Sequence, residues 1–238
     1  MTTGAIKTGS FVASQVLELN RDRGQARSEL VGPAVTISHQ AGSGAREVAE
    51  RLADILQRTE PGIAQPWKVL DRQLVEHALE EHHLPRRLAR RMPEDKRSYV
   101  DDILDDFFGL RPPSWVLVPQ VAETIMHLAE AGHVILVGRG STVITSQLPN
   151  VYHVRLVAPL ATRIERVRQS SKLGAQAAAR FVEKEDRGRR RYVKGNFHAN
   201  VDDELLYHLV VNTGHVPPVD AAEVIAEGAR RCFLLTST

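Results

Sequence analysis

A short β-branched run that passes through a glycine turn into an amphipathic helix constrains this chain more than any other feature. Residues 34–38 read AVTIS, which is typical of a buried strand. The turn HQAGSGA follows, and helical spacing then relates four apolar residues, Val48, Leu52, Ile55 and Leu56. Such a turn can bind phosphate, because its backbone N–H groups converge and the helix N-terminus is positive.

The alternation of strands and helices continues along the chain. Apolar runs predict four more strands, at 67–71, 133–138, 151–157 and 206–212. Helical patterns lie between them, at 120–131, 160–169 and 221–232. Strands that alternate with helices favour βαβ units and a parallel sheet covered on both faces. We therefore predict a three-layer α/β domain.

Three segments stand outside this alternation. Residues 1–30 are predicted to form a short N-terminal helix and a polar connection to a domain that spans 31–238. Residues 72–127 form a long, mostly helical insertion, and residues 180–197 are rich in arginine. In open parallel sheets, ligands bind beyond the carboxyl ends of the strands. Both insertions leave from such ends, so we expect them to flank one cleft.

Composition and charge exclude several classes of protein. The 31 Lys and Arg against 29 Asp and Glu leave a formal charge of +2, which does not indicate a strongly basic nucleic-acid binder. The single cysteine, Cys232, cannot form an intramolecular disulfide. No run approaches the roughly 20 apolar residues of a membrane span, and the N-terminus lacks the apolar core of a signal peptide. We expect a cytoplasmic protein with small-molecule partners and no membrane contact, and the sequence leaves a homodimer open.

As a bare motif, the glycine turn departs from the orthodox phosphate loops. The Walker A pattern G-x-x-x-x-G-K-[ST] matches only at Gly44, because His39 replaces the first glycine, Ala45 the lysine and Arg46 the hydroxyl residue. The dinucleotide pattern G-x-G-x-x-G fails where Glu47 stands at the third glycine. The turn alone is therefore equally compatible with an ordinary strand-to-helix connection.

The wider pattern resembles the cytidylate kinase-like family. The stretch VTISHQAGSGAREVAERLA is similar to the family's first strand, phosphate loop and helix, and VLDRQLVEHAL to the end of its second strand. HVILVGRGSTVITSQLPNVYHVRLVAPLATRIERV is similar to the family's GRD-containing region, and EDRGRRRYVKGNF and LYHLVVNTGH to its lid and last strand. The resemblance runs from about Val35 to Arg230. It implies a P-loop kinase-like domain with a helical acceptor-binding insertion at 72–127 and an arginine-rich lid at 180–197.

The resemblance also implies an activity, namely the ATP- and Mg²⁺-dependent phosphorylation of a nucleoside monophosphate, with CMP or dCMP as first choice. The residues that would bind the nucleotide phosphates are then Gly42, Ser43, Gly44, Ala45, Arg46 and Glu47. Arg46 would stand in for the P-loop lysine, since a guanidinium can bind phosphate bidentately, and Glu47 would be the Mg²⁺ ligand. Asp71 and Arg139 would bind the acceptor.

The predicted lid holds a cluster of basic residues, Arg187, Arg189, Arg190, Arg191 and Lys194. At helical spacing Arg187 and Arg191 share one face, with Arg190 close by. These three, together with Arg46, are the predicted catalytic residues, because lid cations can stabilise the charge on a phosphoryl group in transfer. Glu183 and Asp186 would hold the lid arginines in an open form.

Three other functions remain open. At Ala45, Glu47 and Gly140 the family's chemistry-bearing residues are replaced, which favours a nucleotide-binding sensor without kinase activity. Gly140 stands where the family has an aspartate, which allows a kinase for another small acceptor. The basic lid could also contact RNA, although few aromatic residues are interleaved with it.

Overall fold

The computed structural model describes residues 32–59, 66–71 and 117–236. Within these ranges the strands form one parallel sheet in the order β2-β3-β1-β4-β5, so that β1 lies at its centre. The strands are β1 (Ala34–His39), β2 (Lys68–Leu70), β3 (Val134–Val137), β4 (Val151–Val157) and β5 (Leu209–Asn212). Each overlaps a strand predicted from the sequence, and the predicted parallel sheet is confirmed.

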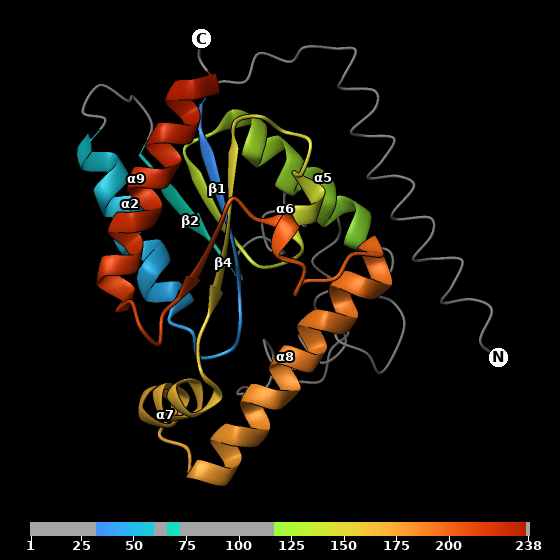
Figure 1. The fold of residues 1–238 in the computed structure, drawn as a ribbon. Helices are drawn as coiled ribbons and strands as arrows, with labels where there is room; N and C mark the ends of the chain where they lie inside the picture. The colour runs from blue at the N-terminus through green and yellow to red at the C-terminus, as the bar shows by residue number, and fades with distance from the viewer. Residues whose placement is uncertain (1–31, 60–65, 72–116, 237–238) are drawn as a thin grey trace, which may run out of the picture.

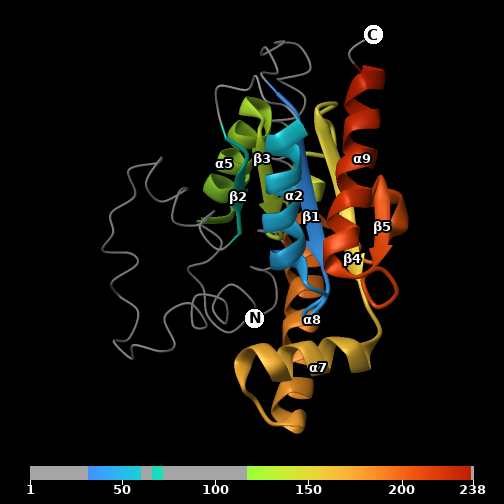
Figure 2. The ribbon, with the colours of Figure 1, turned by 90° about the vertical axis from the view of Figure 1, so that its left-hand side faces the viewer.

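Helices cover both faces of this sheet (Figures 1 and 2). On one face lie α2 (Ala45–Thr59) and α9 (Pro218–Thr236). The other face is covered by α5 (Leu117–Ala131), α6 (Ser141–Ile144) and the C-terminal part of α8 (Ala175–Phe197). The three-layer α/β class is therefore confirmed. None of the described helices is long and apolar enough to cross a bilayer.

The side chains of β1 alternate between these two layers. Val35 and Ile37 are fully buried against α2 and α9, whereas Ala34 packs with α5 on the opposite side. Thr36 and Ser38 follow Ala34 on that second face, because successive side chains of a strand point to opposite sides. This face therefore changes from apolar to polar as the strand approaches its carboxyl end, the edge at which ligands bind in open parallel sheets.

The boundaries of the two predicted insertions differ from those of the observed helices. Helix α5 begins at Leu117, and its Val118 and Val121 belong to the core, so residues 117–127 of the predicted insertion are part of the sheet's covering layer. The rest of that insertion, 72–116, lies outside the described residues, as does the predicted N-terminal helix. The predicted lid is the larger part of α8, a single helix whose Tyr192 and Phe197 are buried against α5.

Beyond the carboxyl edge of the sheet, α7 (Leu160–Ser171) and the N-terminal half of α8 project together (Figures 1 and 2). A small apolar cluster of Ala41, Val167, Ala178 and Val182 joins both helices to the loop after β1. The short 3-10 helix η3 (Glu204–Leu206) precedes β5 and was not predicted. These elements surround the edge of the sheet at which the predicted site residues lie.

Buried His153 is expected to make the protein less stable in acid. It lies on β4 with 5% of its surface exposed, and its Nδ1 is 2.8 Å from Thr36 Oγ1. Burial, with a smaller contribution from His208, lowers the pKa of His153 from 6.5 to about 4. Because the folded-state pKa is below that of the unfolded chain, protons bind preferentially to the unfolded chain as the pH falls below about 6.5. We expect a loss of about 2 kcal/mol in the free energy of unfolding from this residue between about pH 7.5 and about pH 5.

Urea unfolding at these two pH values measures the effect. In His153→Gln the loss of stability on acidification should be about 2 kcal/mol smaller than in the wild-type protein. An unchanged pH dependence in His153→Gln would contradict the expectation.

Candidate active site

The loop between β1 and α2 is shaped by glycines in the left-handed region. Gly42 has a φ of +76° and Gly44 a φ of +81°. A Cβ on Gly42 would lie 2.4 Å from the backbone oxygen of Arg163, so no other residue fits without a shift of α7. The Ser43 amide donates to Gln40 O at 3.2 Å, and Thr213 Oγ1 donates to Ser43 O at 2.8 Å. The loop is thus held from both sides.

A buried ion pair fixes the same loop to α7 and α8. Asp186 of α8 accepts from the Ala41 amide at 2.8 Å and from Arg163 Nη1 at 2.6 Å. Arg163 also donates to Ala158 O and Ala41 O, at 3.0 and 3.2 Å. Both ionised side chains are less than 10% exposed as residues, so their charges and donors are satisfied by each other and by the loop backbone. The shape of the loop therefore depends on the position of α8.

Substitution of Gly42 tests the shape of this loop. Taking ATP as the ligand that the family resemblance implies, we expect Gly42→Ala to lower its affinity by more than about tenfold, because a left-handed alanine costs about 1–2 kcal/mol and its Cβ would also displace the Arg163 backbone. Gly195→Ala is the matched control, since no atom lies within 4 Å of its added Cβ and it sits inside α8. Calorimetric titration with ATP measures both variants, and equal affinities for them would contradict the expectation.

One pocket lies over the glycine loop and has a volume of about 1150 Å³. The N–H groups of Ala45, Arg46 and Glu47 in the first turn of α2 have no intrahelical partners. Ser43 Oγ is buried and has no hydrogen-bond partner among the described residues. Each of these residues lines the pocket. The pocket thus offers several hydrogen-bond donors to an anion, and we call it the loop pocket.

A second pocket lies beside the first and has a volume of about 180 Å³. The turn after β3 forms one wall, with positive φ at Gly138, Arg139 and Gly140 (78°, 56° and 73°). A positive φ at a residue other than glycine is uncommon, and such strain gathers at functional sites. A Cβ on Gly140 would lie 2.5 Å from Phe197 Cε2, which explains why no larger residue stands there. We call this cavity the turn pocket.

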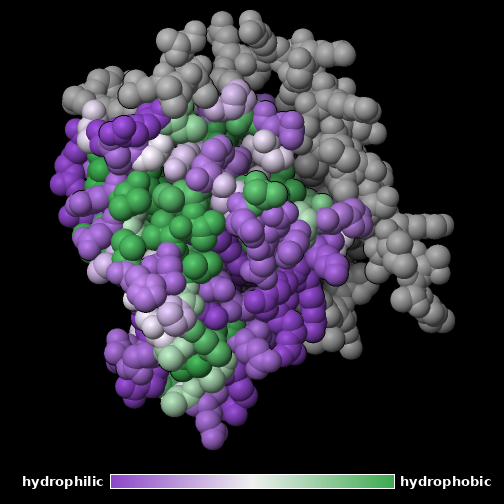
Figure 3. Space-filling model, viewed as in Figure 1, coloured by the Kyte–Doolittle hydropathy of each residue, from purple (hydrophilic) through white to green (hydrophobic). Residues whose placement is uncertain are grey.

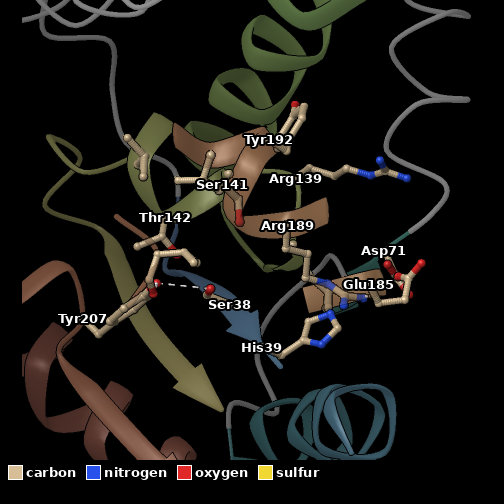
Figure 4. A pocket seen from close by; sticks show the side chains of 16 residues that line it. Ser38, His39, Asp71, Arg139, Ser141, Thr142, Glu185, Arg189, Tyr192 and Tyr207 are labelled. Atoms are coloured by element: carbon tan, nitrogen blue, oxygen red, sulfur yellow. Dashed lines mark hydrogen bonds and ion pairs between the residues drawn. The ribbon is translucent and has the colours of Figure 1, made fainter. Parts of the chain in front are cut away.

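Four polar side chains line both pockets and lie where they meet: His39, Asp71, Glu185 and Arg189 (Figure 4). Arg189 Nη2 is 3.2 Å from Glu185 Oε2, whereas its buried Nη1 lies 3.8 Å from Asp186 Oδ1, too far for a hydrogen bond, and has no hydrogen-bond partner among the described residues. Burial lowers the pKa of Arg189, which Glu185 and Asp186 oppose, and a guanidinium stays charged under these conditions. The junction therefore holds a cation with an unsatisfied donor.

His39 stays neutral beside this cation. Burial first, and then the charge of Arg189, lower the pKa of His39 from 6.5 to about 3. Its Nδ1 lies 3.2 Å from Gln40 O, a contact in which the ring nitrogen donates because a carbonyl can only accept. The Nε2 atom of the neutral ring is therefore a hydrogen-bond acceptor. His39 adds a neutral acceptor where an orthodox phosphate loop has its first glycine.

The structure brings most of the predicted site residues together. Six line the loop pocket, namely Gly42, Ser43, Gly44, Ala45, Arg46 and Glu47. The two predicted acceptor-binding residues, Asp71 and Arg139, line the turn pocket. The Ser43 amide, however, already donates a hydrogen bond to Gln40 O, in place of one to a phosphate. Arg46 lies at the rim, with its side chain 85% exposed and its Nε 2.8 Å from Glu50.

The predicted lid arginines lie away from both pockets, whereas Arg189 lines both of them. Arg187 is exposed and pairs with Glu183, Arg190 donates to Asp202 Oδ2 at 2.8 Å, and Arg191 is exposed. None of the three lines either pocket. The surface over the middle of α8 is correspondingly hydrophilic (Figure 3). Their spacing put the three on one helical face, but that face points to solvent because α8 buries the other.

The inner face of α8 could have been found in the sequence. Its residues Val182, Asp186, Arg189 and Val193 follow one another at steps of four, three and four, which is the period of one helix face. The two valines mark that face as buried, so the charged residues between them were the candidates for the cleft. Glu185 and His39 carried no comparable signal.

Comparisons with known proteins give a family match, similar solved structures and a partial sequence match. The model of the cytidylate kinase-like family matches residues 34–215. An uncharacterized protein from Eubacterium ventriosum has the same fold, with a TM-score of 0.61 and 17% identity over 83% of this chain and 98% of that one. Shikimate kinase from Bacteroides thetaiotaomicron superposes with a TM-score of 0.45 and 13% identity, over 86% and 98% of the two chains. A uronate isomerase from Corynebacterium glutamicum is 28% identical over 101 residues, and the match covers 42% of this chain and 20% of that protein.

Proposed function

Because the chain belongs to the cytidylate kinase-like family, we propose that it transfers the γ-phosphoryl group of ATP to a nucleoside monophosphate, with CMP or dCMP as the first choice. Membership of this family favours a phosphotransferase. The observation that carries the proposal is the meeting of two pockets at Arg189, one over a glycine loop and one beside Arg139. This layout suits phosphoryl transfer, because the acceptor oxygen must approach the γ-phosphorus in line with the leaving oxygen. A cation between the two pockets can stabilise the charge on the group in transfer.

The loop pocket suits the donor nucleotide. Its backbone N–H groups and Ser43 Oγ would bind the phosphates, and Arg46 at the rim would add positive charge. Farther along the pocket, Arg166 is fixed by bonds of 3.0 and 2.8 Å to Thr213 Oγ1 and O, and Pro218 lies near Gly44. A planar guanidinium held in this way can stack on a base. We assign the adenine ring to the space between Arg166 and Pro218.

The junction suits the transferred group. During transfer, the bond between the γ-phosphorus and the bridging oxygen of ADP breaks while an acceptor oxygen bonds to phosphorus. Negative charge spreads over the equatorial oxygens of the moving group. The unsatisfied Nη1 of Arg189 would donate to one of them, and His39 Nε2 could accept a hydrogen bond from the acceptor or from water. Water would be displaced as the acceptor fills the turn pocket.

A magnesium ion accompanies ATP in kinases of this kind, and the donor set of the pocket fits it. No group of three or more His, Cys, Asp or Glu within 32–59, 66–71 and 117–236 could hold a metal ion by itself. Mg²⁺ commonly takes only one or two carboxylates, with phosphate oxygens and waters at its other positions. Glu47 and Asp71 line the loop pocket and would supply them. When bound, Mg²⁺ neutralises charge on the β- and γ-phosphates.

A phosphotransfer assay tests the proposal. Purified protein is incubated with Mg²⁺-ATP and each of CMP, dCMP, UMP, AMP, GMP and dTMP, and ADP and the phosphorylated product are both quantified. We expect transfer to CMP or dCMP that is reduced in Arg46→Ala. ATP binding without transfer to any nucleotide would refute the proposed acceptor class and favour a nucleotide sensor.

A kinase for a small alcohol is the second candidate. The observation that favours it is the pair of carboxylates, Asp71 and Glu185, which line the turn pocket beside the transfer point. A hydroxyl acceptor must lose a proton as it attacks phosphorus, whereas a phosphate acceptor is already ionised. Asp71 could take that proton. Transfer to a sugar or polyol, lost in Asp71→Asn, would support this candidate over the first.

A further inference from the structure

Hydrogen-bonded polar side chains form the floor of the turn pocket. Ser38 at the end of β1 and Arg155 on β4 are register partners on neighbouring strands, and Tyr207 reaches them from the segment between η3 and β5. Arg155 is 5% exposed. Figure 4 shows the hydroxyls of Ser38 and Tyr207 directed toward each other beneath the pocket. This floor belongs to the strand face that turns polar toward its carboxyl end.

The direction of every hydrogen bond in this floor follows from its two ends. Arg155 Nη1 lies 2.8 Å from Ser38 Oγ, and a guanidinium can only donate. At the other end Tyr207 Oη lies 2.8 Å from Val201 O, and a carbonyl can only accept. Tyrosine has one hydroxyl hydrogen, so it points to Val201. The 3.2 Å contact between Tyr207 Oη and Ser38 Oγ joins two hydroxyls and can run in either direction, so with the tyrosine hydrogen on the nearer Val201 carbonyl we assign the hydrogen of this contact to Ser38.

Further contacts fix the arginine end of this chain of hydrogen bonds. Arg155 Nη2 donates to Asp202 Oδ1 at 2.8 Å, and Asp202 Oδ2 accepts from Arg190 at 2.8 Å. Burial raises the pKa of Tyr207, so that the phenol keeps its hydrogen. The hydrogen bonds from Arg155 to Ser38, from Ser38 to Tyr207 and from Tyr207 to Val201 therefore all donate in the same direction. Ser38 receives one hydrogen bond, spends its only hydrogen on Tyr207 and retains one lone pair for a ligand.

We propose that Ser38 is a specificity-determining residue of the turn pocket, where it accepts a hydrogen bond from an N–H or O–H group of the bound acceptor. A carbonyl oxygen at the same place would face the lone pair of Ser38 without a hydrogen between them. Leaving such buried polar groups unpaired disfavours binding strongly. The inference rests on the proposed function, because it takes the turn pocket to hold the phosphoryl acceptor.

Calorimetric titration with matched nucleotides tests this inference. CMP and UMP differ by an amino against an oxo group, and AMP and IMP differ in the same way. We expect the amino member of the pair that binds to bind at least about tenfold more tightly, in line with about 1.4 kcal/mol for one well-placed hydrogen bond. In Ser38→Ala the ratio should fall below about threefold, whereas Ser146→Ala, at an exposed position after α6, should retain it.

Tyr207→Phe provides a second test, because its expected effect would not arise if Ser38 and Tyr207 had a purely structural role. Without the tyrosine oxygen, the hydrogen of Ser38 is released and can turn to the ligand. The oxo member of the pair should therefore gain affinity relative to the amino member, although Ser38 itself is intact. This shift of preference toward the oxo member depends on the direction of the hydrogen bonds in the floor and not on the stability of the protein.

The outcomes separate the inference from the proposed function, because the titration needs no turnover. Discrimination without phosphoryl transfer would sustain the role of Ser38 and refute the kinase. Transfer without discrimination would do the reverse. Equal binding of both members, tighter binding of the oxo member, an unchanged ratio in Ser38→Ala, or no binding of any of the four nucleotides would overturn the inference.

Discussion

Replacing Arg189 by methionine is expected to lower kcat by about 10²–10³-fold while the KM for ATP changes by less than about threefold. Arg189 lines both pockets and carries a buried nitrogen without a hydrogen-bond partner among the described residues. Removing one such donor from the developing charge of a transition state has an effect of this size in other enzymes. Methionine keeps much of the aliphatic volume, so the change isolates the charge. Steady-state kinetics with the best acceptor measures it.

The controls come from the same helix. Arg187→Met and Arg191→Met remove exposed arginines that line neither pocket, and both should leave kcat within about twofold of wild type. A large loss of kcat in Arg191→Met with little loss in Arg189→Met would return the catalytic role to the face predicted from helical spacing. Equal losses in all three would point to general damage to α8.

Replacing Asp186 by alanine is expected to lower the free energy of unfolding by about 3–5 kcal/mol. Arg163 would keep its charge in a buried position without its carboxylate partner, and breaking a buried pair from one side has a cost of this size. The Ala41 amide would also lose its acceptor, so the glycine loop should bind ATP less tightly. Urea unfolding monitored by circular dichroism measures the stability.

Glu183→Ala is the matched control for this substitution. Glu183 lies one turn earlier on α8 and forms an exposed pair with Arg187, which should contribute less than about 1 kcal/mol. In the Asp186→Ala background, a further Arg163→Met substitution should recover part of the lost stability, because it removes the unpaired charge. A loss below about 1 kcal/mol in Asp186→Ala would show that the pair does not hold α8 to the loop.

Together these substitutions test two roles of α8, namely shaping the glycine loop and placing Arg189 at the junction of the pockets. Its buried Asp186 shapes the donor loop, and Arg189, three residues on, enters the junction of the pockets. Any movement of α8 would therefore change the donor loop and the junction together. Asp202, which joins Arg190 of α8 to Arg155 of β4, extends this connection to the floor of the turn pocket.

The strands and the class of fold could be predicted from the sequence because they depend on short-range pattern. The run AVTIS became β1, and the apolar residues Val48, Leu52 and Leu56 became the buried face of α2. Hydrophobic periodicity and glycine placement act over a few residues, so they can be found without knowing what packs against them. Gly42, Gly44 and Arg139 were placed at the carboxyl edge for the same reason, since each lies in the loop that follows a strand.

Only the tertiary structure decided which charged side chains reach the site. The spacing from Val182 and Val193 marks Arg189 as the inward arginine of α8, but only the packing of α8 against the sheet brings that side chain to the junction of the two pockets. The same holds for Ser38 and Tyr207, which are 169 positions apart and meet because β5 closes beside β4. Local pattern sets the direction of a strand or helix, but the identity of its neighbours depends on burial of the whole chain at once, and that decides which polar groups share a pocket.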